Sequence, residues 1–184
     1  GTGRLLRRTA PPAENRPATM KTIPLFGPYA LRPLRDGDAA EIFAVIDTQR
    51  AHLGPWLPFV AETHCVEQTR EVVASMRADA SAPVFTIRDG DAFAGLIGFK
   101  SADLRSRSIE IGYWLREEQQ GKGVMTAAVR ALCRLAFAEL GMHRIFIRCA
   151  TGNGPSNRIP QRLGFRLDRV EPRGERLRTA AGST

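Results

Sequence analysis

The stretch that decides the fold of this chain is residues 109–126, IEIGYWLREEQQGKGVMT. It begins as a partly alternating strand and ends in the turn Gly121-Lys122-Gly123, just ahead of a helical pattern. Glycines permit unusual dihedral angles and a close approach of backbone to ligand. The N–H groups of a helix's first turn lack intrahelical partners and favour an anion. A strand, this turn and a helix therefore predict an anion site, with a purely structural turn as the alternative.

Two common nucleotide-binding motifs do not fit this turn. The Walker motif requires Gly-x-x-x-x-Gly-Lys-Ser/Thr, and neither that spacing nor the Lys-Ser/Thr pair is present. The dinucleotide fingerprint requires Gly-x-Gly-x-x-Gly, and Thr126 stands where its third glycine belongs. The turn on its own therefore identifies no particular anion.

The surrounding sequence predicts a mixed α/β domain. Apolar residues at helical spacing make residues 124–140 the clearest helix, which Gly141 ends. Period and capping signals predict further helices after Asp38 and at residues 67–79 and 155–163. Strands are expected at residues 29–34, 83–88, 92–100, 107–115, 143–149 and from 165 onward. No internal repeat is found, and the length fits a single domain.

Both ends differ in composition from this domain. Residues 1–19 are rich in proline and poor in large apolar groups, which predicts a disordered tail. The domain itself is expected to span residues 20–170. Residues 171–184 show no apolar alternation and read as a basic tail.

The net charge of +8 is spread along the chain. Residues 1–19 contribute +3, residues 166–184 contribute +2, and the body contributes +3. A weakly basic body suits an anionic ligand, and no aromatic and basic pattern indicates nucleic-acid binding. No apolar run approaches the roughly 20 residues that span a bilayer, and no secretory signal is recognisable. Three cysteines, an odd number without metal-type spacing, predict a reducing cytoplasm.

Residues 109–126 closely resemble the coenzyme A site of the GNAT superfamily of N-acetyltransferases, and within it the RimJ/RimL group. A second stretch, residues 153–165, NGPSNRIPQRLGF, resembles the Asn-x-x-Ser helix of that family, which ends in Gly-Phe. The two motifs occur in the family's order about 30 residues apart, and the likeness extends from about residue 29 to 167. It implies a mostly antiparallel central sheet, splayed at the acetyl-CoA site, with helices on both faces.

The sequence departs from the family at two places. Glu118 stands where the family usually has Gln or Arg, and an acid there does not favour a pyrophosphate. Similar enzymes also continue past the Gly-Phe strand into a hairpin and a long last strand. Only 19 residues follow Phe165, so the C-terminal strand is expected to be truncated, supplied by another subunit, or divergent.

The resemblance implies residues for both ligands. Those expected to bind acetyl-CoA are Trp114, Leu115, Gln120, Gly121, Lys122, Gly123, Val124, Met125, Asn153, Ser156 and Arg158. Those expected to line the acceptor cleft are Trp56, Phe59 and Tyr113, for which an ordinary core role is the alternative.

Acetyl transfer to an amine needs a base, an oxyanion site and a proton donor for the leaving thiolate. By resemblance Glu110 is the base; alternatively it pairs with Arg105 or Arg107. Many GNAT enzymes have a tyrosine seven residues after the motif's asparagine, where this chain has Pro160. Ser156 is then the candidate donor, unless it only caps its helix.

Cys149 invites a covalent mechanism, but no histidine or helix N-terminus is evidently placed to lower its pKa. Direct transfer in a ternary complex is therefore expected. The three histidines are scattered, so no metal is expected.

The chain is thus expected to acetylate a primary amine, by resemblance a protein N-terminal α-amine of ribosomal type. One alternative is a small amine such as a polyamine, aminoglycoside or amino acid. Another is a catalytically weak acyl-CoA binder. A monomer or a homodimer is expected, with no membrane partner.

Overall fold

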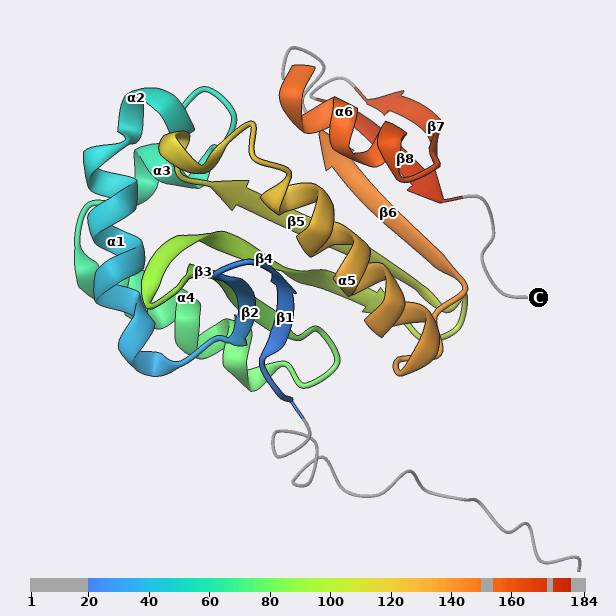
Figure 1. Cartoon of the computed structure of the whole chain (residues 1–184), viewed down its shortest axis with the longest axis horizontal. Helices are drawn as coiled ribbons and strands as arrows, with labels where there is room; N and C mark the ends of the chain where they lie inside the picture. The colour runs from blue at the N-terminus through green and yellow to red at the C-terminus, as the bar shows by residue number, and fades with distance from the viewer. Residues whose placement is uncertain (1–19, 150–153, 172–173, 180–184) are drawn as a thin grey trace, which may run out of the picture.

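The computed structural model describes residues 20–149, 154–171 and 174–179. Within them, one sheet has the strand order β1-β2-β3-β4-β5-β6-β8-β7 (Figure 1). The β5–β6 pair is parallel and the other pairs are antiparallel. The strands are β1 (Ile23–Phe26), β2 (Tyr29–Pro33), β3 (Val84–Asp89), β4 (Ala92–Asp103), β5 (Ser108–Leu115), β6 (Arg144–Cys149), β7 (Phe165–Glu171) and β8 (Gly174–Thr179).

Helices cover both faces of this sheet (Figure 1). Helices α1 and α4 pack on one face, where their buried residues join Phe93 and Trp114 of the strands. Helix α5 packs on the other face. The helices are α1 (Ala39–Thr48), α2 (Arg50–Leu53), α3 (Phe59–Glu62), α4 (Val66–Ala78), α5 (Val124–Ala138) and α6 (Gly154–Arg162), with short 3-10 turns η3 (Asp36–Asp38) and η4 (Glu117–Gln119).

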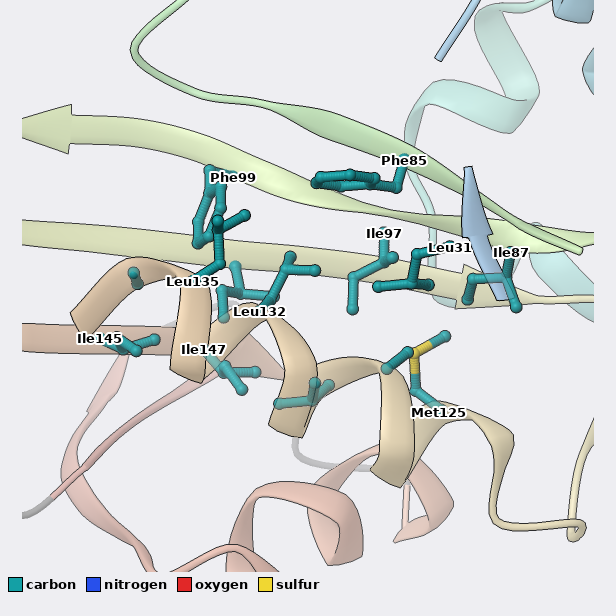
Figure 2. Packing of buried hydrophobic residues seen from close by; sticks show 14 of the residues in the cluster. Leu31, Phe85, Ile87, Ile97, Phe99, Met125, Leu132, Leu135, Ile145 and Ile147 are labelled. Carbon is teal, nitrogen blue, oxygen red and sulfur yellow. The ribbon is translucent and has the colours of Figure 1, made fainter. Parts of the chain in front are cut away.

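The larger core lies between α5 and the sheet (Figure 2). Leu132 is fully buried and Leu135 nearly so, and they pack among sheet residues that include Ile97 and Ile147. Their spacing follows the helical period, so one stripe of α5 meets the sheet along its length. Burial of one such side chain contributes about 1.5–3 kcal/mol. This packing fixes where the first turn of α5 lies relative to β5.

The expected mixed α/β domain with a mostly antiparallel, splayed sheet is confirmed. The predicted helices and strands lie where expected to within a few residues. Strand β1 was missed because it has four residues and contains Pro24, which weakens a strand signal except at a sheet edge. The predicted tail at residues 1–19 lies outside the described residues.

Of the three alternatives for the C-terminal strand, truncation and supply by another subunit are wrong, which leaves a divergent strand. Strand β8 lies within the segment predicted to be a basic tail, and it pairs with both β6 and β7. Its sequence, Gly-Glu-Arg-Leu-Arg-Thr, has a single large apolar residue, so local pattern gives no strand signal. Pairing on both sides supplies the backbone hydrogen bonds that define the strand. The chain's own last strand, and not another subunit's, therefore borders β6.

The sheet opens between β5 and β6. Their register runs from Ser108↔Arg144 to Ile111↔Ile147 and then stops. Strand β5 continues through Leu115 alongside β4, whereas the end of β6 pairs with β8. A gap in the backbone pairing therefore begins after Ile111, on the side where β5 runs toward η4 and α5.

Candidate active site

The turn before α5 has the backbone of an anion cradle. Gly121 and Gly123 have φ values of +74° and +78°, in the left-handed region that favours glycine. The first intrahelical bond runs from Ala127 N–H to Gly123 C=O, at 3.1 Å. The N–H groups of the three residues between them precede that bond and are directed out of the helix end. A Cβ on either glycine would meet no atom within 4 Å, so the turn faces open space.

A cavity of about 280 Å³ joins this turn to the end of β5. Its walls come from β5, the first turn of α5, the segment around α2, and α6. The structure therefore brings together residues that are more than 100 positions apart in sequence. The predicted site residues that line it are Trp56, Tyr113, Trp114, Leu115, Gln120, Gly121, Gly123, Val124, Met125 and Arg158.

Other predicted site residues lie elsewhere. Lys122 is exposed on the turn, and Phe59 is exposed on α3, but neither lines the cavity. Ser156 lies in the first turn of α6, and its side chain is not among those described. Asn153 lies outside the described residues.

The cavity also has lining residues that the sequence did not single out. His52 on α2 and Arg162 on α6 add polar and cationic groups, and Thr126 extends the helix turn. Arg162 stands four residues after Arg158, on the same face of a helix, and that spacing is a readable signal. Nothing local in the sequence marks His52 as a neighbour of the glycine turn.

Two amide side chains hold the segment that leads into the turn. Gln49, between α1 and α2, donates to both carboxylate oxygens of Glu118, at 2.9 and 3.0 Å, and accepts the Glu117 N–H at 3.0 Å. Gln119 accepts the Tyr29 hydroxyl at 2.7 Å and donates to Asp89 at 3.0 Å. The polar segment is thus fastened to α1 on one side and to the β2–β3 end of the sheet on the other.

A further polar contact crosses the cavity mouth. Gln120 Nε2 lies 3.2 Å from His52 Nε2, which joins α2 to the residue just before the first glycine. The segment around α2 and the glycine turn are therefore in direct contact.

Glu118 does not point into the cavity. Its carboxylate lies between Gln49 and Arg116, and it is not among the lining residues. Its pKa is held below the usual value, chiefly by its own backbone N–H and next by the donation from Gln49. The acid that stands in place of Gln or Arg therefore attaches this segment to the end of α1 and does not line the cavity.

Glu110 lies on β5 outside this cavity. Its side chain is 12% exposed, and Arg148 Nη2 of β6 is 3.7 Å from its Oε1. Within the described residues its ion-pair partner is thus Arg148. The alternative prediction, a pair with Arg105 or Arg107, is wrong. Its neighbours Ile109 and Ile111 belong to the α5 core, so Glu110 faces the opposite side of the sheet.

The end of β5 directs backbone donors toward the gap. The Arg116 N–H donates to Ala94 C=O on the β4 side, at 2.9 Å. Because N–H groups alternate sides along a strand, the Leu115 N–H is directed away from β4, where pairing with β6 has ended. A carbonyl placed in the gap would meet this donor.

The part of the chain that the structure describes contains no group of three or more His, Cys, Asp and Glu side chains placed to hold a metal ion. Within it, no helix combines the length and the apolar character needed to cross a membrane. Cys149 ends β6, and its side chain lies outside those described.

Comparison with known proteins identifies the family of the chain. Residues 29–166 match the acetyltransferase (GNAT) domain. The chain belongs to the GNAT acetyltransferase family. This GNAT chain is 34% identical to the Bacillus subtilis protein YdaF, a candidate ribosomal N-acetyltransferase, over 73% of the chain and 76% of YdaF.

Further relatives of this GNAT chain agree. It is 31% identical to the ribosomal-protein-serine acetyltransferase of Escherichia coli, over 68% of the chain and 70% of that protein. Its fold superposes with a TM-score of 0.80 on RimL, a ribosomal L7/L12 α-N-protein acetyltransferase solved in complex with coenzyme A, at 22% identity over 86% of the chain and 96% of RimL. The chain is therefore an N-acetyltransferase, and acetyl-CoA is its acyl donor.

The residues present fit that donor. An exposed glycine turn at a helix N-terminus suits a pyrophosphate, and Lys122 and Arg158 stand nearby as cations. The gap between β5 and β6 offers backbone groups to an extended, amide-containing arm, as an added strand would use them. Acetyl-CoA supplies an activated thioester, and the protein's part is to orient it and to manage protons.

Proposed function

We propose that this GNAT acetyltransferase modifies the N-terminal α-amine of a protein, of the ribosomal-protein type. The sequence relatives named above carry ribosomal acetylation in their names, and a second Escherichia coli relative is the ribosomal protein uS5 alanine N-acetyltransferase, at 28% identity over 73% of the chain. The observation that carries the proposal is the joining of the glycine turn, the open β5 end and α2 in one cavity. Donor and acceptor segments meet there.

The proposed chemistry is direct transfer within a ternary complex. An α-amine has a pKa near 8, so part of it is neutral at physiological pH and a weak base is sufficient. Glu110, on the face opposite α5, is the proposed proton acceptor, acting through water because it lies outside the cavity. The Leu115 N–H is the proposed donor to the developing oxyanion.

The remaining site roles are proposals from position. By resemblance, we assign Asn153 to the donor's arm and Ser156, in the first turn of α6, to its leaving thiolate. Trp56, which is 40% exposed at the cavity wall, and Tyr113 are the proposed acceptor contacts, with Phe59 at the outer margin.

A reducing cytoplasm is the proposed location. Cys65 is an exposed free thiol, which persists where disulfides do not form. We propose that the working unit is a monomer or a homodimer.

The test is a screen that measures release of the coenzyme A thiol. The acceptors are N-terminal peptides of ribosomal proteins and, as alternatives, spermidine, an aminoglycoside and free amino acids. We expect turnover with peptides. Turnover confined to small amines would replace the proposed acceptor. Acetyl-CoA binding without any turnover would indicate an acyl-CoA binder.

Gly123→Glu is the matched binding variant. A carboxylate on the turn repels the pyrophosphate, and a side chain at positive φ is strained, so acetyl-CoA should no longer raise the melting temperature. Gly37→Glu, at an exposed glycine of ordinary φ that does not line the cavity, should keep the shift. Retained acetyl-CoA affinity in Gly123→Glu would mean that the turn is only structural.

A further inference from the structure

Strand β4 carries a bulge beside Glu110. The β4–β5 register passes from Phe99↔Ile111 to Ser101↔Glu110, so Lys100 is an extra residue without a Cα partner. Bulges re-aim side chains and are frequent next to active sites. Phe99 packs into the α5 core, which places the Lys100 side chain on the opposite face of the sheet, the face of Glu110.

The Lys100 side chain lies flat across β5 over Gly112. A Cβ built on Gly112 would be 2.4 Å from Lys100 Cε, 3.1 Å from Cδ and 3.2 Å from Cγ. Only glycine leaves room for this stem. Because a C–N single bond is about 1.5 Å long, the ammonium also lies close to Gly112.

Gly112 marks the point where the sheet opens. It is the first residue of β5 beyond Ile111↔Ile147, the last pair of the β5–β6 ladder. The bulge and the glycine together therefore hold a cation at the start of the gap, on the face that α5 does not cover.

The charges at this place are unequal. Glu110 already has Arg148 beside it, at 3.7 Å, and that arginine is 45% exposed. Among the described residues, Lys100 has no carboxylate within 4.0 Å. Counting only side chains that the structure describes, two cations thus lie on this face with one carboxylate.

The donor's anionic end belongs at the N-terminus of α5, on the other face. We take the acceptor to approach the gap from the face of Lys100 and Glu110. An acceptor with a carboxylate near its amine would find a partner in Lys100, whereas a polyamine would be repelled.

We propose that Lys100 determines acceptor specificity by binding an acidic side chain at the second or third position of the acceptor peptide. This inference rests on the proposed function, because it presupposes a peptide acceptor. It narrows the substrate class to N-termini that carry Asp or Glu close to the α-amine.

The test compares two peptides that differ only by Asp or Asn at position 2, with spermidine as a third acceptor. We expect wild-type kcat/KM to favour the Asp peptide by about two- to five-fold, the range of an exposed, partly screened charge pair. Lys100→Met should remove the preference, and Lys100→Arg should keep it. Gly112→Ala should reduce it without removing the charge, because the new methyl displaces the Lys100 stem.

Two controls and a second readout separate this inference from the proposed function. Lys21→Met removes an exposed lysine ahead of β1 and should leave the preference intact. Calorimetric titration of the Asp peptide into protein with desulfo-coenzyme A should show weaker binding for Lys100→Met, with the affinity for desulfo-coenzyme A unchanged.

The outcomes differ in what they overturn. Equal losses for the Asp and Asn peptides in Lys100→Met, or a wild type that does not distinguish them, would overturn the role of Lys100 alone. A wild type that acetylates spermidine and no peptide would overturn the proposed function, and this inference with it.

Discussion

Glu110 has two possible roles, as the general base of the reaction and as the ion-pair partner of Arg148. If Glu110 is the base, Glu110→Gln should lower kcat mainly below pH 8, where the α-amine is mostly protonated and proton removal limits the rate. A loss of about ten- to hundred-fold at pH 7 is expected for a base that acts through water. The measurement is kcat against pH from 6 to 9.5 with saturating acetyl-CoA.

Arg148→Gln is the control for this prediction. It removes the ion pair but leaves the carboxylate, so the base should still function. If both variants show the same kcat and the same pH profile, Glu110 acts only through the pair.

Burial makes the thiol of Cys133 unreactive. It lies on α5 beside the core, and burial raises the pKa of its thiol to about 12. Since the thiolate is the reactive form, alkylation at pH 8 should be about a thousand-fold slower than for a thiol of ordinary pKa. Iodoacetamide labelling with peptide-resolved mass spectrometry should therefore modify the exposed Cys65 first.

The same shift gives a pH dependence of the opposite kind to a carboxylate's. The pKa of the Cys133 thiol is higher in the folded state than in the unfolded chain. The stabilisation that comes from burying the neutral thiol is therefore complete at pH values below the pKa of the unfolded chain, and it is lost as the pH rises toward 12. Rapid labelling of Cys133 at pH 8, before global unfolding, would contradict its burial.

At the level of elements, Gln49 is the joint between α1, α2 and η4. Gln49→Ala removes the contacts to Glu117 and Glu118 and should let the segment before the glycine turn move. We expect KM for acetyl-CoA to rise about three- to ten-fold, the worth of roughly one hydrogen bond, with kcat nearly unchanged. Steady-state kinetics at a fixed, saturating peptide concentration measure this.

An exchange of groups tests the joint directly. Gln49→Glu places two carboxylates together and should weaken acetyl-CoA binding more than alanine does. The double variant Gln49→Glu/Glu118→Gln restores a donor and an acceptor and should recover most of the affinity. No recovery would mean that the contact does not hold the turn.

Elements with a strong internal period were the predictable part of this fold. The α5 stripe and the strand ahead of the turn follow from local sequence, and the glycines mark the anion site. Strand β8 did not follow, because its pairing with β6 and β7 defines it rather than its own apolar pattern. The Gln49–Glu118 contact spans 69 positions, and no local rule connects such residues. The placement of Lys100 depends on a one-residue register shift, which periodicity does not reveal.

For the whole molecule, stability depends on the layer between α5 and the sheet (Figure 2). Leu132 is fully buried there, so Leu132→Ala should cost about 2–5 kcal/mol of the free energy of unfolding. Urea denaturation followed by circular dichroism measures the change. Val72→Ala on α4, where the side chain is 52% exposed, should stay within about 0.5 kcal/mol of wild type. Similar losses for both would contradict the assignment of the core.

The short β5–β6 ladder has a mechanical consequence. Four residue pairs join the sheet from β1 to β5 with the unit of β6, β8 and β7, whereas β4 and β5 pair along eight. Amide protons along this seam should exchange with solvent sooner than those of β3 and β4. A ligand lodged in the seam would act as a missing strand and stiffen the joint between the two parts. Binding of acetyl-CoA would then slow amide exchange in both parts of the sheet, including at residues that do not contact the ligand.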